Sequence, residues 1–251
     1  MSMQDMIAAL ALPADSRVDQ RVPKKLFLEQ GAPTAADKRI IQEGIEDIFW
    51  VASLKPANIG VPAFKDEARE YVEIAVLSGT LRADAKTTRL IELIHRAVPY
   101  PVLLVSAQTG LATVSLAHKR ASQAQATAVV IDGAIVASGL ETESKSFEAP
   151  FLAHLPLAKQ PGQSLWSVYQ GWIDCVQALA VARLTGRYAL TQTADEAAAR
   201  QTALENHMRI TREIAGLRAK AAKEKQINRR VDLNLAIQGL EEELRAAANR
   251  L

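Results

Sequence analysis

The sequence has few residues that could build a covalent or metal-held scaffold. Its 251 residues include a single cysteine, Cys175, which excludes an internal disulfide and a multi-cysteine zinc site. We interpret Cys175 as a small core residue, because its neighbours are mostly apolar. No apolar run approaches the roughly 18 residues of a membrane-spanning helix. Residues 1–19 also lack a basic segment before an apolar run, so we expect no signal peptide and a cytoplasmic protein.

The sequence motifs of several large enzyme classes are absent as well. The chain contains no Walker A loop, no Gly-x-Gly-x-x-Gly, no Gly-x-Ser-x-Gly and no His-Glu-x-x-His. Its histidines are too far apart to form a local metal motif, and we expect surface or boundary positions for all of them: His95, His118, His154 and His207. We therefore predict no metal site and no cofactor.

What the chain does contain is typical of a globular protein with a large core. Hydrophobic residues make up 49% and charged residues 23% of the sequence, which excludes a wholly disordered chain. The formal net charge is only +2, but the charge is unevenly distributed. Residues 218–230 hold six basic residues and one acid, Glu224, and a more acidic stretch with Asp232 and residues 241–243 follows.

The order of apolar patterns and turn residues predicts an α+β fold with a mixed sheet of about five strands. We expect an irregular arm over residues 1–33, an α+β domain over 34–190 and a helical C-terminal arm, resembling a coiled coil, over 191–251. Helices are predicted from Thr34 through residues 48–52, from 84–87 to 98, and from Ser164 to about Gly186. Strands are predicted at residues 71–77, 101–105 and 111–119, the second of them central because it is almost wholly apolar.

Two finer predictions concern a hairpin and the C-terminal arm. Because Asp-Gly accepts the positive φ angles of a two-residue turn, Asp132 and Gly133 predict a β-hairpin between 127–131 and 134–137. Residues 139–163 are expected to form an irregular connector. In the arm, Thr193 and Glu196 fit a capping box. Two apolar stripes follow, over 210–235 and 233–251, and they are out of phase. This pattern leaves open a kink, a helical hairpin, or one helix packed from two sides.

A weak pattern is similar to the metal centre of restriction-type nucleases. That chemistry needs an Asp and a Glu-x-Lys on a neighbouring strand to hold Mg²⁺ and a water molecule. Asp132, Glu143 and Lys145 have a permissible spacing. However, Asp132 is better explained as a turn residue, and residues 141–146 lack the apolar flanks of a buried strand. A metal-dependent nuclease therefore remains an alternative hypothesis.

The basic segment is the second candidate site. Its cations could line up against nucleic-acid phosphates, or they could form a solvated helix face. Aromatic residues are missing from the arm, so stacking on single-stranded bases is not supported. The candidate phosphate contacts are Arg218, Lys220, Lys223, Lys225, Arg229 and Arg230.

Four segments carry a resemblance to a known family. They are RVPKKLF at 21–27, IEDIFW at 45–50, VPYPVLL at 98–104 and KEKQINRRVDLN at 223–234. Over about residues 20–245 the chain resembles the bacterial domain-of-unknown-function family numbered 4391. The resemblance implies no catalytic residue. It implies a genomic setting beside helicases and DNA methyltransferases, in loci of the phage-defence or restriction kind.

These observations favour a non-catalytic accessory protein of such a defence system. We expect its C-terminal helices to dock a helicase or methyltransferase partner near DNA. The partner-binding candidates combine amides with an apolar stripe: Asn228, Val231, Asn234, Ile237, Leu240 and Leu244. A metal-dependent nuclease and a structural homodimer held together by the arm are the alternatives.

Overall fold

The computed structural model describes residues 2–123, 128–140 and 146–248. The chain divides into two compact units, Met1–Ala180 and Val181–Leu251, and each unit is treated separately below. Among the described residues, none of the helices combines the length and the apolar character that crossing a membrane requires.

The first unit is built on a mixed six-stranded sheet, which confirms the α+β prediction and adds a strand to it. The strand order is β1-β2-β5-β6-β7-β8, and all neighbours are antiparallel except β5 and β6. Helix α5 (Thr87–Ala97) connects this parallel pair, as a crossover must. The strand bounds are β1 Arg17–Arg21, β2 Ile45–Leu54, β5 Ile74–Leu81, β6 Val102–Gln108, β7 Leu111–Ala121 and β8 Val129–Leu140.

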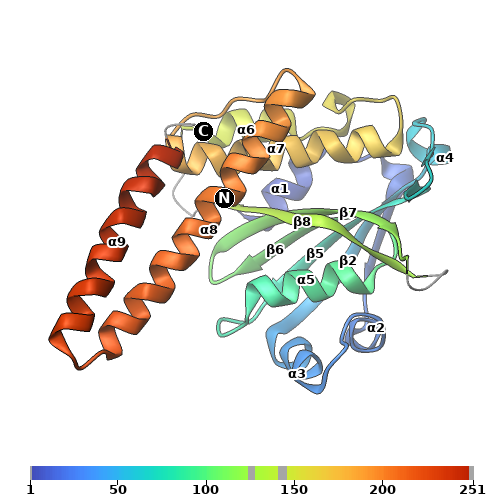
Figure 1. The fold of residues 1–251 in the computed structure, drawn as a ribbon. Coiled ribbons are helices and arrows are strands. Elements are labelled where there is room, and N and C mark those ends of the chain that lie inside the picture. The colour runs from blue at the N-terminus through green and yellow to red at the C-terminus, as the bar shows by residue number, and fades with distance from the viewer. Residues whose placement is uncertain (1, 124–127, 141–145, 249–251) are drawn as a thin grey trace. The chain divides into compact units, whose positions relative to one another are not determined.

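Helices cover both faces of this sheet (Figure 1). One face carries α2 (Lys24–Gln30), α3 (Ala35–Gly44) and α5, whose apolar side chains pack on the inward residues of β5 and β6. The other face carries α1 (Met3–Ala9), α6 (Glu148–His154) and the first part of α7 (Leu165–Thr185). Two short strands, β3 (Phe64–Lys65) and β4 (Glu70–Tyr71), form a separate hairpin. The single-turn helix α4 (Pro56–Ile59) precedes this hairpin.

Several elements agree with the sequence predictions because their signals are local. Thr34 caps α3 by accepting a hydrogen bond from the Asp37 backbone N–H at 3.1 Å. Ser164 accepts a hydrogen bond from the Ser167 N–H at 3.2 Å, at the start of α7. Strand β6 is central in the sheet and buried along its first five residues, as its apolar sequence predicts.

The prediction of an irregular arm over residues 1–33 is wrong. This segment contains α1, β1 and α2, and β1 forms one edge of the sheet by pairing with β2. Met6, Leu10 and Phe27 are fully or almost fully buried. Strand β1 itself is polar and exposed along its length, so no apolar alternation marked it in the sequence.

The predicted helix after Thr34 is correct only to Gly44, where the chain continues as β2. Ile45, Ile48 and Val51 are buried in this strand, a spacing of three that resembles helical periodicity. The spacing arises because the pairing of β2 with β5 shifts register twice, between Ile45 and Asp47 and again between Trp50 and Ala52. Each such irregularity returns the next apolar side chain to the same face one residue late.

The predicted hairpin turn at Asp132 is also wrong. Strand β8 continues through Asp132 and Gly133, and it pairs with β7 on both sides of this point. Between Leu116 and His118 on β7, the partner residue on β8 moves from Val136 to Asp132. Gly133 adopts the expected positive φ, 78°, but in a bulge rather than a turn. The connector predicted at 139–163 contains α6 and a short 3₁₀ turn, Leu157–Lys159.

The second unit is a helical hairpin of α8 (Ala194–Lys223) and α9 (Ile227–Ala248). This resolves the out-of-phase stripes, because the first stripe does not belong to one helix. Its first part lies on α8 and faces α9, whereas Val231 and Leu235 lie on α9 and are exposed. The buried contact is made by Ile210, Ile214, Ile237 and Ala247, with Leu217, Leu240 and Leu244 packed around them. The Thr193 hydroxyl caps α8 as expected, by accepting a hydrogen bond from the Glu196 N–H. A capping box would also have the Glu196 carboxylate accept from the Thr193 N–H. It accepts instead from the N–H of the preceding residue, Gln192.

Candidate functional site

The turn between α8 and α9 gathers most of the basic segment. Residues 224–226 connect the helices, so the end of α8 and the start of α9 come together. Side chains from both helices line a shallow hollow there: Lys220, Lys223, Glu224, Arg229, Asp232 and Leu233. Lys225 and Arg230 are exposed beside it. Folding therefore concentrates cations that the sequence spreads over eleven positions.

Arg218 differs from the other five basic residues of the segment. Its guanidinium donates to the Glu241 carboxylate at 2.7 Å and so connects α8 to α9. Lys220, Lys223, Lys225, Arg229 and Arg230 are all exposed, and none of them forms an ion pair with a described residue. We name these five residues the turn cations. Two acids, Glu224 and Asp232, line the same hollow, so the five cations outnumber them.

The residues predicted to bind a partner fall on two sides of α9. Ile237, Leu240 and Leu244 pack against α8 inside the hairpin, and Ile237 is only 8% exposed. Their role in this structure is therefore internal. Asn228, Val231 and Asn234 are exposed. At 3.6 residues per turn, each amide lies about 60° around the helix from Val231, whereas Leu240 lies about 180° away from it.

Val231 belongs to an exposed apolar row that the sequence predictions named only in part. Ile227, Val231 and Leu235 follow each other at intervals of four residues and are 68%, 50% and 60% exposed. We name these three residues the α9 stripe. In the sequence they merge with the buried stripe of the hairpin, and only the position of α8 separates the two faces.

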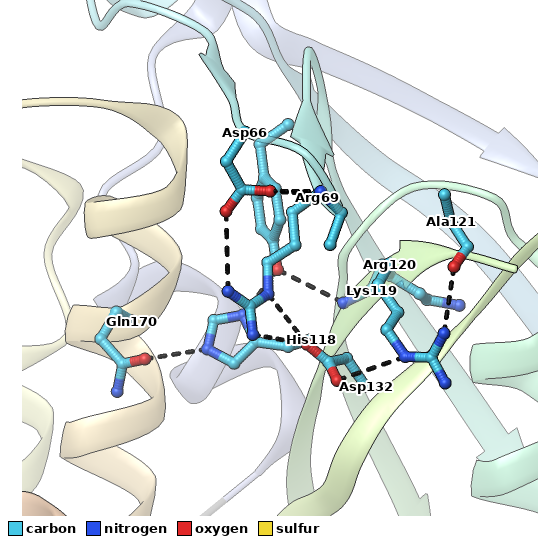
Figure 2. A network of polar contacts seen from close by, with 10 residues as sticks. Asp66, Arg69, His118, Lys119, Arg120, Ala121, Asp132 and Gln170 are labelled. Carbon is cyan, nitrogen blue, oxygen red and sulfur yellow. Dashed lines mark hydrogen bonds and ion pairs between the residues drawn. The ribbon is translucent and has the colours of Figure 1, made fainter. Parts of the chain in front are cut away.

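A polar network in the first unit surrounds Asp132, the first residue of the nuclease hypothesis (Figure 2). Arg69, which precedes β4, donates to the Asp132 carboxylate at 2.7 Å, and Arg120 approaches its other oxygen at 3.5 Å. Figure 2 shows the two guanidinium groups on opposite sides of this carboxylate. Asp132 of β8 thus contacts β7 and the residue that precedes β4, and its carboxylate is paired with two cations. Glu143 and Lys145 lie outside the described residues.

His118 forms the other half of this network. Its Nδ1 lies 2.5 Å from the Tyr71 hydroxyl, and its Nε2 lies 2.8 Å from the Gln170 carbonyl oxygen. Its ring stacks on Trp166 of α7, with centroids 5.7 Å apart. Burial lowers the pKa of His118, only partly offset by Gln170. The ring is therefore neutral near pH 7 and connects the β3–β4 hairpin to α7.

A second polar group lies on the opposite face of β7, and sequence reasoning missed it. Lys119 is almost fully buried, and its ammonium donates to the carbonyls of His95 and Val98 at the end of α5. His95 is fully buried, and its Nε2 lies 3.0 Å from the Ser115 hydroxyl. Burial lowers the pKa of Lys119 to about 8 and that of His95 to about 3. The ammonium satisfies carbonyls that a helix end leaves without partners.

The described residues contain no group of three or more His, Cys, Asp or Glu side chains arranged to hold a metal ion. Asp132, His118 and Lys119 all have polar partners within the first unit, whereas the buried Nδ1 of His95 has no hydrogen-bond partner among the described residues. The hairpin instead exposes cations that form no ion pair with a described residue, the turn cations, and a row of apolar side chains, the α9 stripe.

The family model described as "Domain of unknown function (DUF4391)" matches residues 10–244 of the chain. No curated protein and no solved structure matches it.

Proposed function

We propose, from the premise that the chain belongs to the DUF4391 family, that it is a non-catalytic accessory protein whose C-terminal hairpin docks a protein partner. The partner class is a helicase or DNA methyltransferase acting near DNA in a phage-defence or restriction system. The observation that carries the proposal is the α9 stripe, with three large apolar side chains each at least half exposed.

The spacing of the stripe indicates what it binds. Apolar residues at i, i+4 and i+8 form one face of a helix, and such a face is buried most readily against the apolar face of a second helix. Asn228 and Asn234 flank this face with amide groups, which can fix the register of a helix pair. We therefore assign the surface to an amphipathic helix of the partner.

One acidic residue continues the face of the stripe. Glu242 is exposed and follows Leu235 by seven residues, so it lies on the same side of α9, whereas Glu241 and Glu243 pair with Arg218 and Arg209 of α8. The complementary helix has a basic residue opposite Glu242.

Photo-crosslinking of the full chain tests this proposal. A photo-reactive amino acid placed at Val231 should capture a helicase or methyltransferase at native expression levels. The matched control is Met208 of α8, another exposed apolar position, 56% exposed. With the captured protein purified, Val231→Asp should weaken binding at least about tenfold by calorimetry, because it buries a charge in the contact, whereas Met208→Asp should not.

Two results would overturn the proposal. Capture of the same proteins at both positions would mean that the stripe has no specific partner. Capture of a second copy of this chain, with a dimer in light scattering, would instead support the homodimer alternative. In that case Val231→Asp should convert the dimer to a monomer.

A further inference from the structure

We propose that the turn cations form a binding site for the phosphate backbone of duplex DNA that does not read base sequence. The turn cations and the α9 stripe consist of different residues, so DNA binding and partner binding can be tested independently. Two observations carry the inference: the clustering of five exposed cations at one turn, and the lack of ion pairs between them and any described residue.

The charge balance at the turn differs from that along the rest of the hairpin. Arg209 and Arg218 lie on α8 and pair with Glu243 and Glu241 of α9, so their charge is used within the hairpin. The turn cations have two nearby acids, Glu224 and Asp232, and Glu224 already accepts a hydrogen bond from the Gln226 N–H. The excess positive charge at the turn is therefore available to an external polyanion.

The shape of the turn decides the mode of binding. One helix with its side chains is about 10–12 Å wide, and paired helices lie about 8–10 Å apart, so the turn is roughly 20 Å across. The major groove of B-DNA is about 12 Å wide and admits a single helix. The turn is too broad to enter the groove, and its long Lys and Arg side chains meet the phosphates at the groove edges.

The composition of the hairpin favours a duplex over a single strand. Residues 194–248 contain no Phe, Tyr or Trp, and single-strand binders depend on such rings for base stacking. Binding at this site is therefore electrostatic. Five neutralised phosphates correspond to a log–log dependence of affinity on salt with a slope of about −4.5, from about −0.9 per contact.

Fluorescence anisotropy with the full chain and labelled duplex DNA tests the site. We expect binding at 50 mM salt, equal affinity for two unrelated sequences, and a slope near −4.5 as salt is raised. Lys223→Gln/Arg229→Gln should make the slope shallower by about 1.8, because two contacts are lost. The matched control is Arg212→Gln/Arg245→Gln, which removes the same charge from exposed positions away from the turn. It should leave the slope unchanged.

Other outcomes would overturn the site. Equal effects of the two double substitutions would mean general attraction to the whole chain rather than a site at the turn. Absence of binding at 50 mM salt would make the cations a solvated helix end. Tighter binding to the single strand or to an RNA duplex of the same sequence, or displacement of DNA by polyglutamate at equal charge, would assign the turn to a different polyanion.

Discussion

At the scale of single residues, neighbouring side chains on β7 face different environments. His118 and Lys119 are adjacent, so the pleat directs them to opposite faces of the sheet. His118 joins an aromatic and amide network below α7, and Lys119 reaches the carboxyl end of α5 through the core. Both groups are satisfied within the first unit, which is why we assign them to stability rather than to catalysis.

His95 makes a prediction about pH. Its pKa is about 3 in the folded chain, against 6.5 for an ordinary histidine. Between these values only the unfolded chain takes up the proton, so His95 lowers stability as pH falls below 6.5. His95→Gln keeps a polar group beside Ser115 without this titration. It should flatten the decline by up to about 1.4 kcal/mol per pH unit near pH 4–5. Urea unfolding across pH 4–7 measures this, and an unchanged slope would contradict it.

At the scale of elements, irregular pairing explains where sequence periodicity misleads. The register shifts of β2 produce a three-residue spacing that resembles a helix, and the bulge at Gly133 uses the signal of a hairpin turn. In both places the predicted feature is present: the residues of β2 are buried at intervals of three, and Gly133 has a positive φ. Whether the feature belongs to a helix, a turn or a bulged strand depends on the strand that pairs with it.

The bulge at Gly133 is testable by substitution. Its φ of 78° disfavours any side chain, although a Cβ there would meet no other atom within 4 Å. Gly133→Ala should therefore lower the free energy of unfolding by about 1 kcal/mol through backbone strain alone. Gly162→Ala is the control, because that position is equally open and has no positive φ. Equal effects in denaturant unfolding would show that the strain argument is wrong.

Tyr169 attaches α7 to the centre of the sheet. Its hydroxyl donates to the Val102 carbonyl at 2.7 Å and accepts from the Ala117 N–H at 2.8 Å. Tyr169→Phe leaves both backbone groups buried without this partner, so we expect a loss of about 1–3 kcal/mol in the free energy of unfolding. Tyr100→Phe, at a half-buried position, should cost less. A loss below about 0.5 kcal/mol for Tyr169→Phe would contradict the attachment.

At the scale of the whole molecule, the two units differ in how much core each one has. The first unit buries the central strands β5 and β6 of its sheet between helices, whereas the hairpin core rests on Ile210, Ile214, Ile237 and Ala247. Local opening needs little energy where few apolar side chains are buried. We therefore expect the backbone amides of α8 and α9 to exchange with solvent faster than those of β6.

Truncation inside the hairpin core should widen this difference. Ile214→Ala removes a side chain that is 4% exposed and should destabilise the hairpin by about 2–4 kcal/mol. Met208→Ala on the same helix should change stability by less than about 0.5 kcal/mol, because Met208 is exposed. Hydrogen exchange measured by mass spectrometry on α8 and α9 peptides reports both. Equal exchange in the two variants would contradict the assigned core.

The sequence by itself determined the mixed α+β class, the central β6, helices α5 and α7, and the caps at Thr34 and Thr193. These depend on residues close together in the chain: apolar runs, turn residues, and a hydroxyl three residues before an N–H. Only the tertiary structure decided the path of β1 and β2, the bulge at Gly133 and the burial of Lys119, because each depends on a distant strand or helix. The hairpin is of the same kind. Until α8 faces α9, Ile237 and Val231 are equivalent apolar residues; the contact buries Ile237 and leaves Val231 exposed.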